Sequence, residues 1–207
     1  IIFQAPDSLQ VDYANISDVS CFGGNNGLID ITTIGGFGQN SFLWGNGETT
    51  EDITGLFMGN YSVTISDVNG CFAEANFFVN QADLLSLYIN NTVDVLCFGG
   101  SNASIDLEVQ GGISPYFYIW SDNSSIQDIS NLSAGTYSVT VVDENACIAN
   151  IDTTISQPDP IILNLNYTEN VCYGTFDGEI VANASGGTSP FTYLWSNSET
   201  NHTISNL

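Results

Sequence analysis

Residues 132–143, with the sequence LSAGTYSVTVVD, decide the fold of this chain. Within them Tyr137, Val139 and Val141 alternate with hydroxyl-bearing residues, which is the period-2 pattern of a β-strand that buries one face. Residues 56–67, LFMGNYSVTISD, repeat the pattern. Two copies of such a strand, each preceded by a turn-forming glycine, predict an all-β fold built from repeated units.

Both stretches share the form L-x-x-G-x-Y, in which a tyrosine opens a late strand just after a tight corner. A tyrosine at such a place, with its hydroxyl bonded back to nearby backbone, is the tyrosine corner of immunoglobulin-like sandwiches. We therefore interpret Tyr61 and Tyr137 as tyrosine corners, with an ordinary core tyrosine as the alternative.

Four kinds of landmark recur along the chain at a period of 75 or 76 residues, which indicates a tandem array. Each unit contains a first cysteine, which a tryptophan and a leucine follow at fixed distances, and the two complete units also contain a second cysteine. The landmarks are Cys21, Cys97 and Cys172; Trp44, Trp120 and Trp195; Leu56, Leu132 and Leu207; and Cys71 with Cys147.

The landmarks also predict where the units begin and end. The last residue of the chain corresponds to Leu132, after which repeat 2 still has a late strand and its second cysteine. We therefore expect the third repeat to be truncated at its C-terminal side. The predicted domains are 1–8 as the tail of a preceding repeat, 9–82 as repeat 1, 83–158 as repeat 2 and 159–207 as repeat 3.

Each unit of about 76 residues contains six or seven short strand patterns, and no segment has a helical period of adequate length. Residues 115–120, PYFYIW, are apolar on both faces, so we expect them to form a central strand with proline at its first position. These features predict tandem small immunoglobulin-like antiparallel β-sandwiches with one disulfide each.

The chain carries 23 acidic residues, one histidine and no lysine or arginine, which gives a formal net charge of −23. Without cations to neutralise phosphates, nucleic acids and anionic membrane surfaces are excluded as direct electrostatic partners. A hydrophobic fraction of 43% indicates a folded chain. No apolar run approaches the roughly 18 residues of a membrane-spanning helix, so we expect no direct membrane insertion.

The five cysteines fit a framework of one disulfide per repeat. The spacing is 50 residues in both complete units, so we predict the pairs Cys21–Cys71 and Cys97–Cys147. The partner of Cys172 is then expected near position 222, outside this sequence. Metal binding is the competing interpretation, which the absence of a C-x-x-C motif and of a nearby histidine disfavours. A disulfide framework indicates an oxidising compartment.

No pattern in the sequence indicates an active site, and we expect a non-enzymatic protein without a cofactor. The one histidine, His202, has no counterpart in the other repeats and is interpreted as a surface residue. Two turns are weak candidates for calcium, which prefers several oxygen ligands, although their residue types are also common turn formers. The candidate ligands are Asp67 and Asn69 in repeat 1 and Asp143 and Asn145 in repeat 2.

A specific string of motifs runs through repeat 2. It consists of CFGGSNASI at 97–105, GGISPY at 111–116, Trp120-Ser121, and the stretch 132–143 followed by Cys147. In this combination the chain resembles the SprB repeat, a family found in very large surface proteins of Bacteroidota that include a gliding-motility adhesin. The resemblance covers nearly the whole chain as tandem copies.

The resemblance implies export by the type IX secretion system and display on the extracellular side of the outer membrane. It also implies contact with the secretion and motility machinery. Bacteria of this group attach O-linked glycans at Asp-Ser or Asp-Thr followed by an aliphatic residue or threonine. Ser8 and Thr153 fit that pattern and are candidate glycosylation sites.

Three functions remain open. The leading one is a structural or adhesive segment of a very large secreted adhesin or filament, for gliding motility or surface attachment, whose partners are neighbouring repeats of the same chain. The second is a module that binds a surface polysaccharide or a solid substrate, with weak contacts of Phe22, Phe37 and Phe98 multiplied by avidity. The third is an accessory array on a secreted enzyme.

Overall fold

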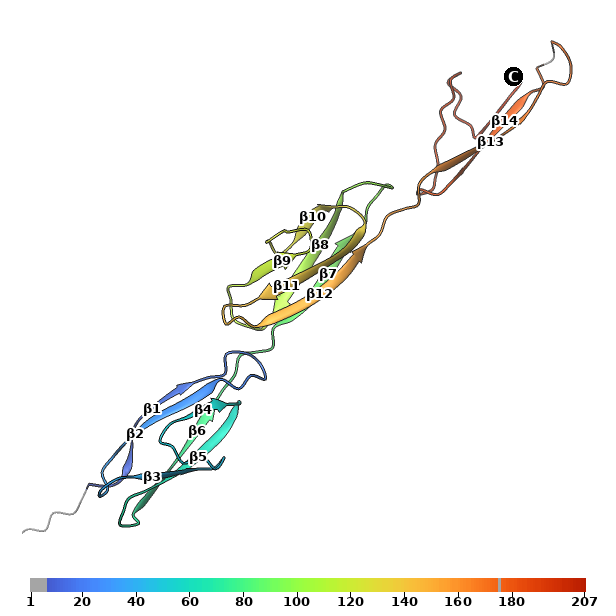
Figure 1. Cartoon of the computed structure of the whole chain (residues 1–207). Coiled ribbons are helices and arrows are strands. Elements are labelled where there is room, and N and C mark those ends of the chain that lie inside the picture. Colours follow the sequence, from blue (N-terminus) through green and yellow to red (C-terminus); the bar gives the residue numbers. More distant parts are fainter. Residues whose placement is uncertain (1–6, 175) are drawn as a thin grey trace, which may run out of the picture. The chain divides into compact units, whose positions relative to one another are not determined.

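The computed structural model describes residues 7–174 and 176–207. Within them every regular element is a β-strand, and the strands form three-stranded sheets with antiparallel pairing (Figure 1). The all-β prediction is confirmed. Residues 1–6, which hold most of the predicted tail of a preceding repeat, lie outside the described residues. In the described part of the chain, no helix is long and apolar enough to cross a membrane.

Repeat 1 is a sandwich of two three-stranded sheets, with the orders β1-β2-β4 and β3-β5-β6. In the immunoglobulin scheme these sheets correspond to strands A, B and E and to strands C, F and G, so strand D is missing. The strands are β1 (Gln10–Ser17), β2 (Gly27–Ile34), β3 (Ser41–Trp44), β4 (Ile53–Leu56), β5 (Gly59–Ser66) and β6 (Phe72–Val79).

The core of repeat 1 lies between these two sheets. Ile29 and Ile31 of β2 and Val63 of β5 are almost fully buried and belong to one apolar cluster. They occupy alternate positions because successive side chains of a strand point to opposite faces. Trp44 of β3 is 1% exposed, and its indole N–H donates to the Thr50 carbonyl at 2.9 Å. Burial of each of these side chains contributes about 1.5–3 kcal/mol relative to exposure.

Repeat 2 repeats this arrangement in the sheets β10-β8-β7 and β12-β11-β9. Ile105 and Leu107 are buried where repeat 1 has Ile29 and Ile31, and Trp120 takes the place of Trp44. The predicted immunoglobulin-like sandwich is therefore confirmed for both complete repeats. The strands are β7 (Ser86–Val93), β8 (Ala103–Gln110), β9 (Phe117–Trp120), β10 (Ile129–Leu132), β11 (Gly135–Val142) and β12 (Ile148–Ile155).

The tyrosine at the third position of each late strand, Tyr61 in β5 and Tyr137 in β11, bonds back to the preceding turn. The Tyr61 hydroxyl donates to the Phe57 carbonyl at 3.0 Å, and the Tyr137 hydroxyl donates to the Ser133 carbonyl at 3.0 Å. This is the hydrogen bond expected of a tyrosine corner. It fixes the chain where it crosses from one sheet of the sandwich to the other.

The expectation that residues 115–120 form a central strand is wrong. Strand β9 is at the edge of its sheet, and β11 occupies the centre. Phe117 and Ile119 are 57% and 60% exposed, whereas Trp120 is buried. Only one face of β9 packs on the core, so the apolar residues on its outer face are surface residues.

Repeat 3 forms one sheet, β13-β14-β15, from β13 (Ile162–Thr168), β14 (Glu179–Ser185) and β15 (Thr203–Ser205). Its Trp195 is only half-buried, although the corresponding tryptophans of both other repeats are buried. Together with Phe191 it lines an open apolar hollow. In repeats 1 and 2 a second three-stranded sheet completes the sandwich.

The chain divides into two compact units whose boundary runs through repeat 2. The first unit contains the residues up to Tyr88 together with Val109–Ile119 and Thr140–Asn150. The second unit contains the remaining residues, including repeat 3. The junction between repeats 1 and 2 therefore lies inside the first unit, and the junction between repeats 2 and 3 lies inside the second.

Candidate functional site: a disulfide that joins two repeats

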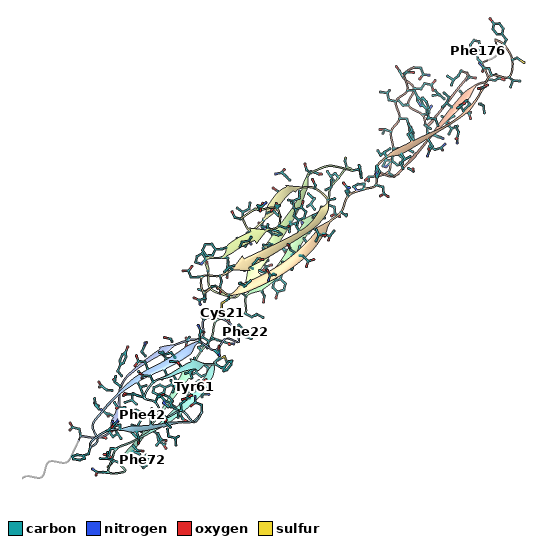
Figure 2. The ribbon with its side chains drawn as sticks, viewed as in Figure 1. Cys21, Phe22, Phe42, Tyr61, Phe72 and Phe176 are labelled. Carbon is teal, nitrogen blue, oxygen red and sulfur yellow. A yellow bond between two sulfur atoms is a disulfide. The ribbon has the colours of Figure 1, made fainter. Side chains whose placement is uncertain are left out.

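The two cysteines of repeat 1 lie at opposite ends of its sandwich. Cys21 is in the loop between β1 and β2, and Cys71 is in the turn between β5 and β6. At the Cys21 end, Gly27 of β2 pairs with Leu56, the last residue of β4, so β5 also begins there. Strand β5 then runs its full 8 residues before the Cys71 turn. Figure 2 shows Cys21 at one end of the repeat and Phe72, which follows Cys71, at the other.

The predicted pairs Cys21–Cys71 and Cys97–Cys147 are wrong, because Cys21 is bonded to Cys147 of the next repeat with a Cα–Cα distance of 5.7 Å. A strand of eight residues is about 24 Å long at roughly 3.4 Å per residue. Two cysteines separated by that length cannot be bridged, since a disulfide needs Cα atoms within about 7 Å. The bond therefore closes a separation of 126 residues across two repeats.

Cys71 and Cys97 are exposed and carry free thiols. Each was predicted to pair with a cysteine that is instead part of the bond between repeats. The prediction that Cys172 pairs near position 222 concerns a residue outside this sequence and stays a prediction.

The loop that carries Cys21 is held to the end of repeat 1 by its backbone. The Val19 N–H donates to the Asn80 carbonyl at 2.9 Å, and the Gly23 N–H donates to the Gln81 side-chain oxygen at 2.9 Å. Gly23 adopts a φ of +71°, which a residue with a side chain rarely adopts. These contacts fix the conformation of the loop that presents Cys21 at the end of the sandwich.

The turn that carries Cys147 is organised by one buried carboxylate. Asp143 is 2% exposed, and its two oxygens accept backbone N–H groups from Ile113 at 2.9 Å, from Asn145 at 2.9 Å and from Cys147 at 2.8 Å. A buried carboxylate must be satisfied in this way, and the three bonds in turn fix the loop and the turn at this end of repeat 2. Asp143 thus positions the cysteine.

Asp67 plays the same part in repeat 1. Its carboxylate accepts N–H groups from Phe37 at 3.0 Å, from Asn69 at 2.9 Å and from Cys71 at 2.9 Å. Burial on its own would raise the pKa of Asp67, but the hydrogen bonds from Cys71, Phe37 and Asn69 outweigh it and hold the pKa below its ordinary value of 3.8. The same turn geometry therefore presents Cys71 and Cys147.

The residues named as weak calcium candidates belong to these two turns. The carboxylates of Asp67 and Asp143 accept backbone N–H groups, and Asn145 Nδ2 donates to the Ser20 carbonyl of repeat 1 at 3.0 Å. Among the described residues no group of three or more His, Cys, Asp and Glu side chains could hold a metal ion. These contacts give Asp67, Asp143 and Asn145 structural roles, and calcium binding stays a prediction.

Apolar side chains surround the disulfide. Phe22, Leu84, Leu85 and Ile148 line a hollow together with Cys21 and Cys147. Phe22, the neighbour of Cys21 in the chain, is 54% exposed and keeps contact with solvent. The site combines a covalent bond, the hydrogen bond from Asn145 and an apolar surround.

The candidate glycosylation sites differ in accessibility. Ser8 is exposed, just before β1. Thr153 is half-buried on β12, on the strand face that also carries the buried Ile155. Its counterpart in repeat 1 is Phe77, whose ring lies 5.9 Å from the Trp44 ring. Ser8 is therefore the more accessible candidate in the folded protein.

His202 lies in repeat 3, just before β15. Its side chain is exposed, and its ring lies 6.4 Å from the ring of Tyr193. No carboxylate or thiol among the described residues joins it in a cluster of the kind that binds metals.

A family model for the SprB repeat matches the chain three times, at residues 13–49, 89–125 and 164–200. The matches cover just over half of the sequence and fall at one position in each repeat. The chain belongs to the SprB repeat family. Each SprB match begins inside the first strand of a repeat and runs beyond its tryptophan.

Three solved structures illustrate what the SprB array is similar to. The three N-terminal domains of the outer capsid protein Hoc of bacteriophage RB49 share 15% identity at a TM-score of 0.47, over 89% of this chain and 70% of that chain. The titin domains I67–I69 share 13% identity at a TM-score of 0.42, over 99% and 90% of the two chains. A C-terminal intimin fragment, in complex with the intimin-binding domain of its receptor, shares 14% identity at a TM-score of 0.40, over 75% and 67%. No curated protein matches the SprB array in sequence.

Proposed function

We propose that this SprB array is a structural, non-enzymatic segment of a large adhesin on the bacterial cell surface, where it serves attachment or gliding motility. The family supports an adhesin-type repeat module at the cell surface. The single observation that carries the structural role is the disulfide from Cys21 to Cys147, which joins two repeats by a covalent bond.

A covalent bond between repeats suits a segment that transmits force. Without the disulfide, repeats 1 and 2 would be joined covalently only by the peptide segment that follows β6. The noncovalent contacts between the two repeats would break when the chain is pulled. The disulfide adds a second covalent path from the loop after β1 to the turn before β12. A pulling force is therefore transmitted from Cys21 to Cys147 directly, and the 126-residue chain segment between them does not bear it.

The proposed location is the extracellular side of the outer membrane, with export by the type IX system. The disulfide supports an oxidising compartment, because cytosolic thiols are kept reduced. The charge of −23 supports a surface role in which neighbouring arrays repel one another and stay dispersed.

Labelling and deletion in the source bacterium test this proposal. Antibodies raised against residues 1–207 should label intact cells, and an in-frame deletion of these residues should reduce attachment to a solid surface or gliding speed. An in-frame replacement by an unrelated immunoglobulin-like array of equal length serves as the control for length. Labelling that requires permeabilised cells, or a deletion that changes neither behaviour, would contradict the proposal.

Binding to a surface polysaccharide or a solid substrate is a second candidate function. Phe22 and Phe98 favour it because they occupy corresponding loops and are 54% and 57% exposed. Phe22→Ala and Phe98→Ala together should abolish retention of the array on polysaccharide-coated beads. Phe72→Ala, which removes a more exposed aromatic ring from β6, is the matched control. Equal retention of all variants would remove this candidate.

A further inference from the structure

We propose that disulfides join consecutive repeats throughout the array, with the first cysteine of each repeat bonded to the second cysteine of the next. Cys21–Cys147 is the first such bond. Cys97 would be bonded to the second cysteine of a completed repeat 3, and Cys71 to the first cysteine of a repeat that precedes repeat 1. The inference concerns covalent structure and holds whatever the array binds.

The loop around Cys97 has the conformation of the bonded loop around Cys21. The Gly24 N–H donates to the Cys21 carbonyl at 3.0 Å, and the Gly100 N–H donates to the Cys97 carbonyl at 2.9 Å. Gly23 and Gly99 have φ values of +71° and +72°. The free Cys97 is thus presented by the same backbone that presents the bonded cysteine.

The attachment of the two loops to their own repeats is also the same. Gly23 N–H donates to the Gln81 side chain at 2.9 Å, and Gly99 N–H donates to the Gln157 side chain at 2.8 Å. The backbone at Val95 likewise donates to the Ser156 carbonyl at 3.0 Å, as Val19 does to Asn80. The cysteine-bearing end of repeat 2 is therefore built like that of repeat 1.

The first residues of repeats 2 and 3 match in the same way. The Gly112 N–H donates to the Asp83 carbonyl at 3.0 Å, and the Gly187 N–H donates to the Asp159 carbonyl at 2.8 Å. In the second junction Cys97, Phe98, Ile161 and Gly187 line a hollow that corresponds to the hollow around Cys21.

The occupant of this second hollow is a strand pair equivalent to β11 and β12, which carries a cysteine in its turn. In the first junction that turn supplies Cys147 and its neighbour Ile148. The same strand pair would cover the open apolar hollow of repeat 3 around Trp195 and Phe191. One added strand pair would therefore fill the hollow beside Cys97 and cover the apolar hollow around Trp195.

Formation of each bond oxidises two thiols to a disulfide and releases two protons and two electrons. A thiol oxidoreductase in its disulfide form accepts the electrons and becomes a dithiol. Such an oxidant belongs to the compartment that the disulfide between Cys21 and Cys147 already requires.

The proposed pattern makes the disulfide loops overlap, because Cys97 lies inside the loop closed by Cys21 and Cys147. When the array is stretched, the shortest covalent path for every two repeats would consist of one disulfide and the 25 residues from Cys147 to Cys172. Those residues span at most about 90 Å, whereas the 151 residues from Cys21 to Cys172 would span roughly 500 Å if free to extend. Overlapping disulfides would limit how far an unfolded array can lengthen.

An extended chain tests the inference directly. A copy of residues 133–158 is appended after Leu207, which corresponds to Leu132, so that repeat 3 is completed with a new cysteine at position 222. In the copy, valine replaces the isoleucine that corresponds to Ile148, so that the peptide of the new cysteine differs in mass from the peptide of Cys147. After oxidative folding, alkylation of free thiols and non-reducing digestion at acidic residues, mass spectrometry should find Cys97 bonded to the new cysteine and Cys71 alkylated.

Three results would overturn the inference: a bond between Cys97 and Cys147, a bond between Cys172 and the new cysteine, or an alkylated Cys97. The control carries serine in place of the new cysteine and should show Cys97 fully alkylated. In both chains the bond between Cys21 and Cys147 reports that the first junction has folded. The disulfide pattern is measured on the purified chain and the surface function on cells. Either proposal can therefore be contradicted while the other stands.

Discussion

At the scale of single residues, two turns with the same geometry differ at one position. Gly70 and Ala146 both lie in the left-handed region, with φ of +81° and +63°. A Cβ in that region costs about 1–2 kcal/mol, and glycine avoids the cost. Repeat 2 therefore holds a strained alanine one residue before the cysteine that joins the repeats. Space is not the cause, since nothing lies within 4 Å of a Cβ built on Gly70.

The substitution Ala146→Gly should raise the free energy of unfolding by about 0.5–1 kcal/mol because it removes this strain. The reciprocal substitution Gly70→Ala should lower it by about 1 kcal/mol. Urea denaturation of the oxidised chain measures both. Effects of equal sign would show that the left-handed backbone does not determine stability at these turns.

A second residue-scale prediction concerns pH. Hydrogen bonds from the Ser156 hydroxyl at 2.6 Å and the Ser156 N–H at 2.8 Å hold the pKa of Asp94 below its ordinary value of 3.8. A lowered pKa in the folded state stabilises the fold above pH 3.8, and this stabilisation is lost as the pH falls from there through the folded pKa. Asp94→Asn should therefore melt below the parent at pH 7, and the difference should vanish in strong acid.

Thermal melts of parent and variant between pH 7 and pH 2 check the pH prediction. Glu51→Gln removes one charge at an exposed position and is the control for net charge. A melting difference for Asp94→Asn that stays constant over the whole range would rule out the assigned role of the carboxylate.

At the scale of elements, alternation of apolar residues predicted strands such as β5 and β11 and the tyrosine at the start of each. It could not place residues 115–120 correctly, because an apolar face indicates burial only where another layer covers it. The sequence could not predict the disulfide pairing either. A period of about 76 residues produces equal spacings within repeats and across them. Only the strand topology shows that Cys21 and Cys71 lie at opposite ends of the sandwich, about the length of β5 apart.

The disulfide should dominate the stability of the junction. Closing a separation of 126 residues is worth about 5 kcal/mol in the chain-entropy account. Cys147→Ser should therefore lower the melting temperature by roughly 10–20 °C. Cys71→Ser, which removes an exposed free thiol from the corresponding turn, should leave it unchanged. Equal effects of the two substitutions in calorimetry would contradict the assignment.

At the scale of the whole molecule, the absence of lysine and arginine means that no ion pair with those side chains offsets the charge of −23. Stability rests on the buried sandwich cores, on strand pairing and on the disulfide. The same composition leaves no cleavage point for trypsin-like proteases. A charge of this size favours expanded states through repulsion, which dissolved salt screens within about 10 Å at 0.1 M.

Moderate salt should therefore raise the melting temperature of the array. Calorimetry between 10 mM and 500 mM NaCl measures the effect, and the reduced Cys147→Ser chain should respond in the same direction because the charge is unchanged. A melting temperature that falls steadily from low ionic strength would show that self-repulsion does not limit stability.

The central claim is that a disulfide joins consecutive repeats, and peptide mapping of the oxidised 207-residue chain under non-reducing conditions tests it most directly. The account predicts one peptide pair linking Cys21 to Cys147, with Cys71 and Cys97 recovered in alkylated form. Recovery of Cys21 linked to Cys71 together with Cys97 linked to Cys147 would contradict it.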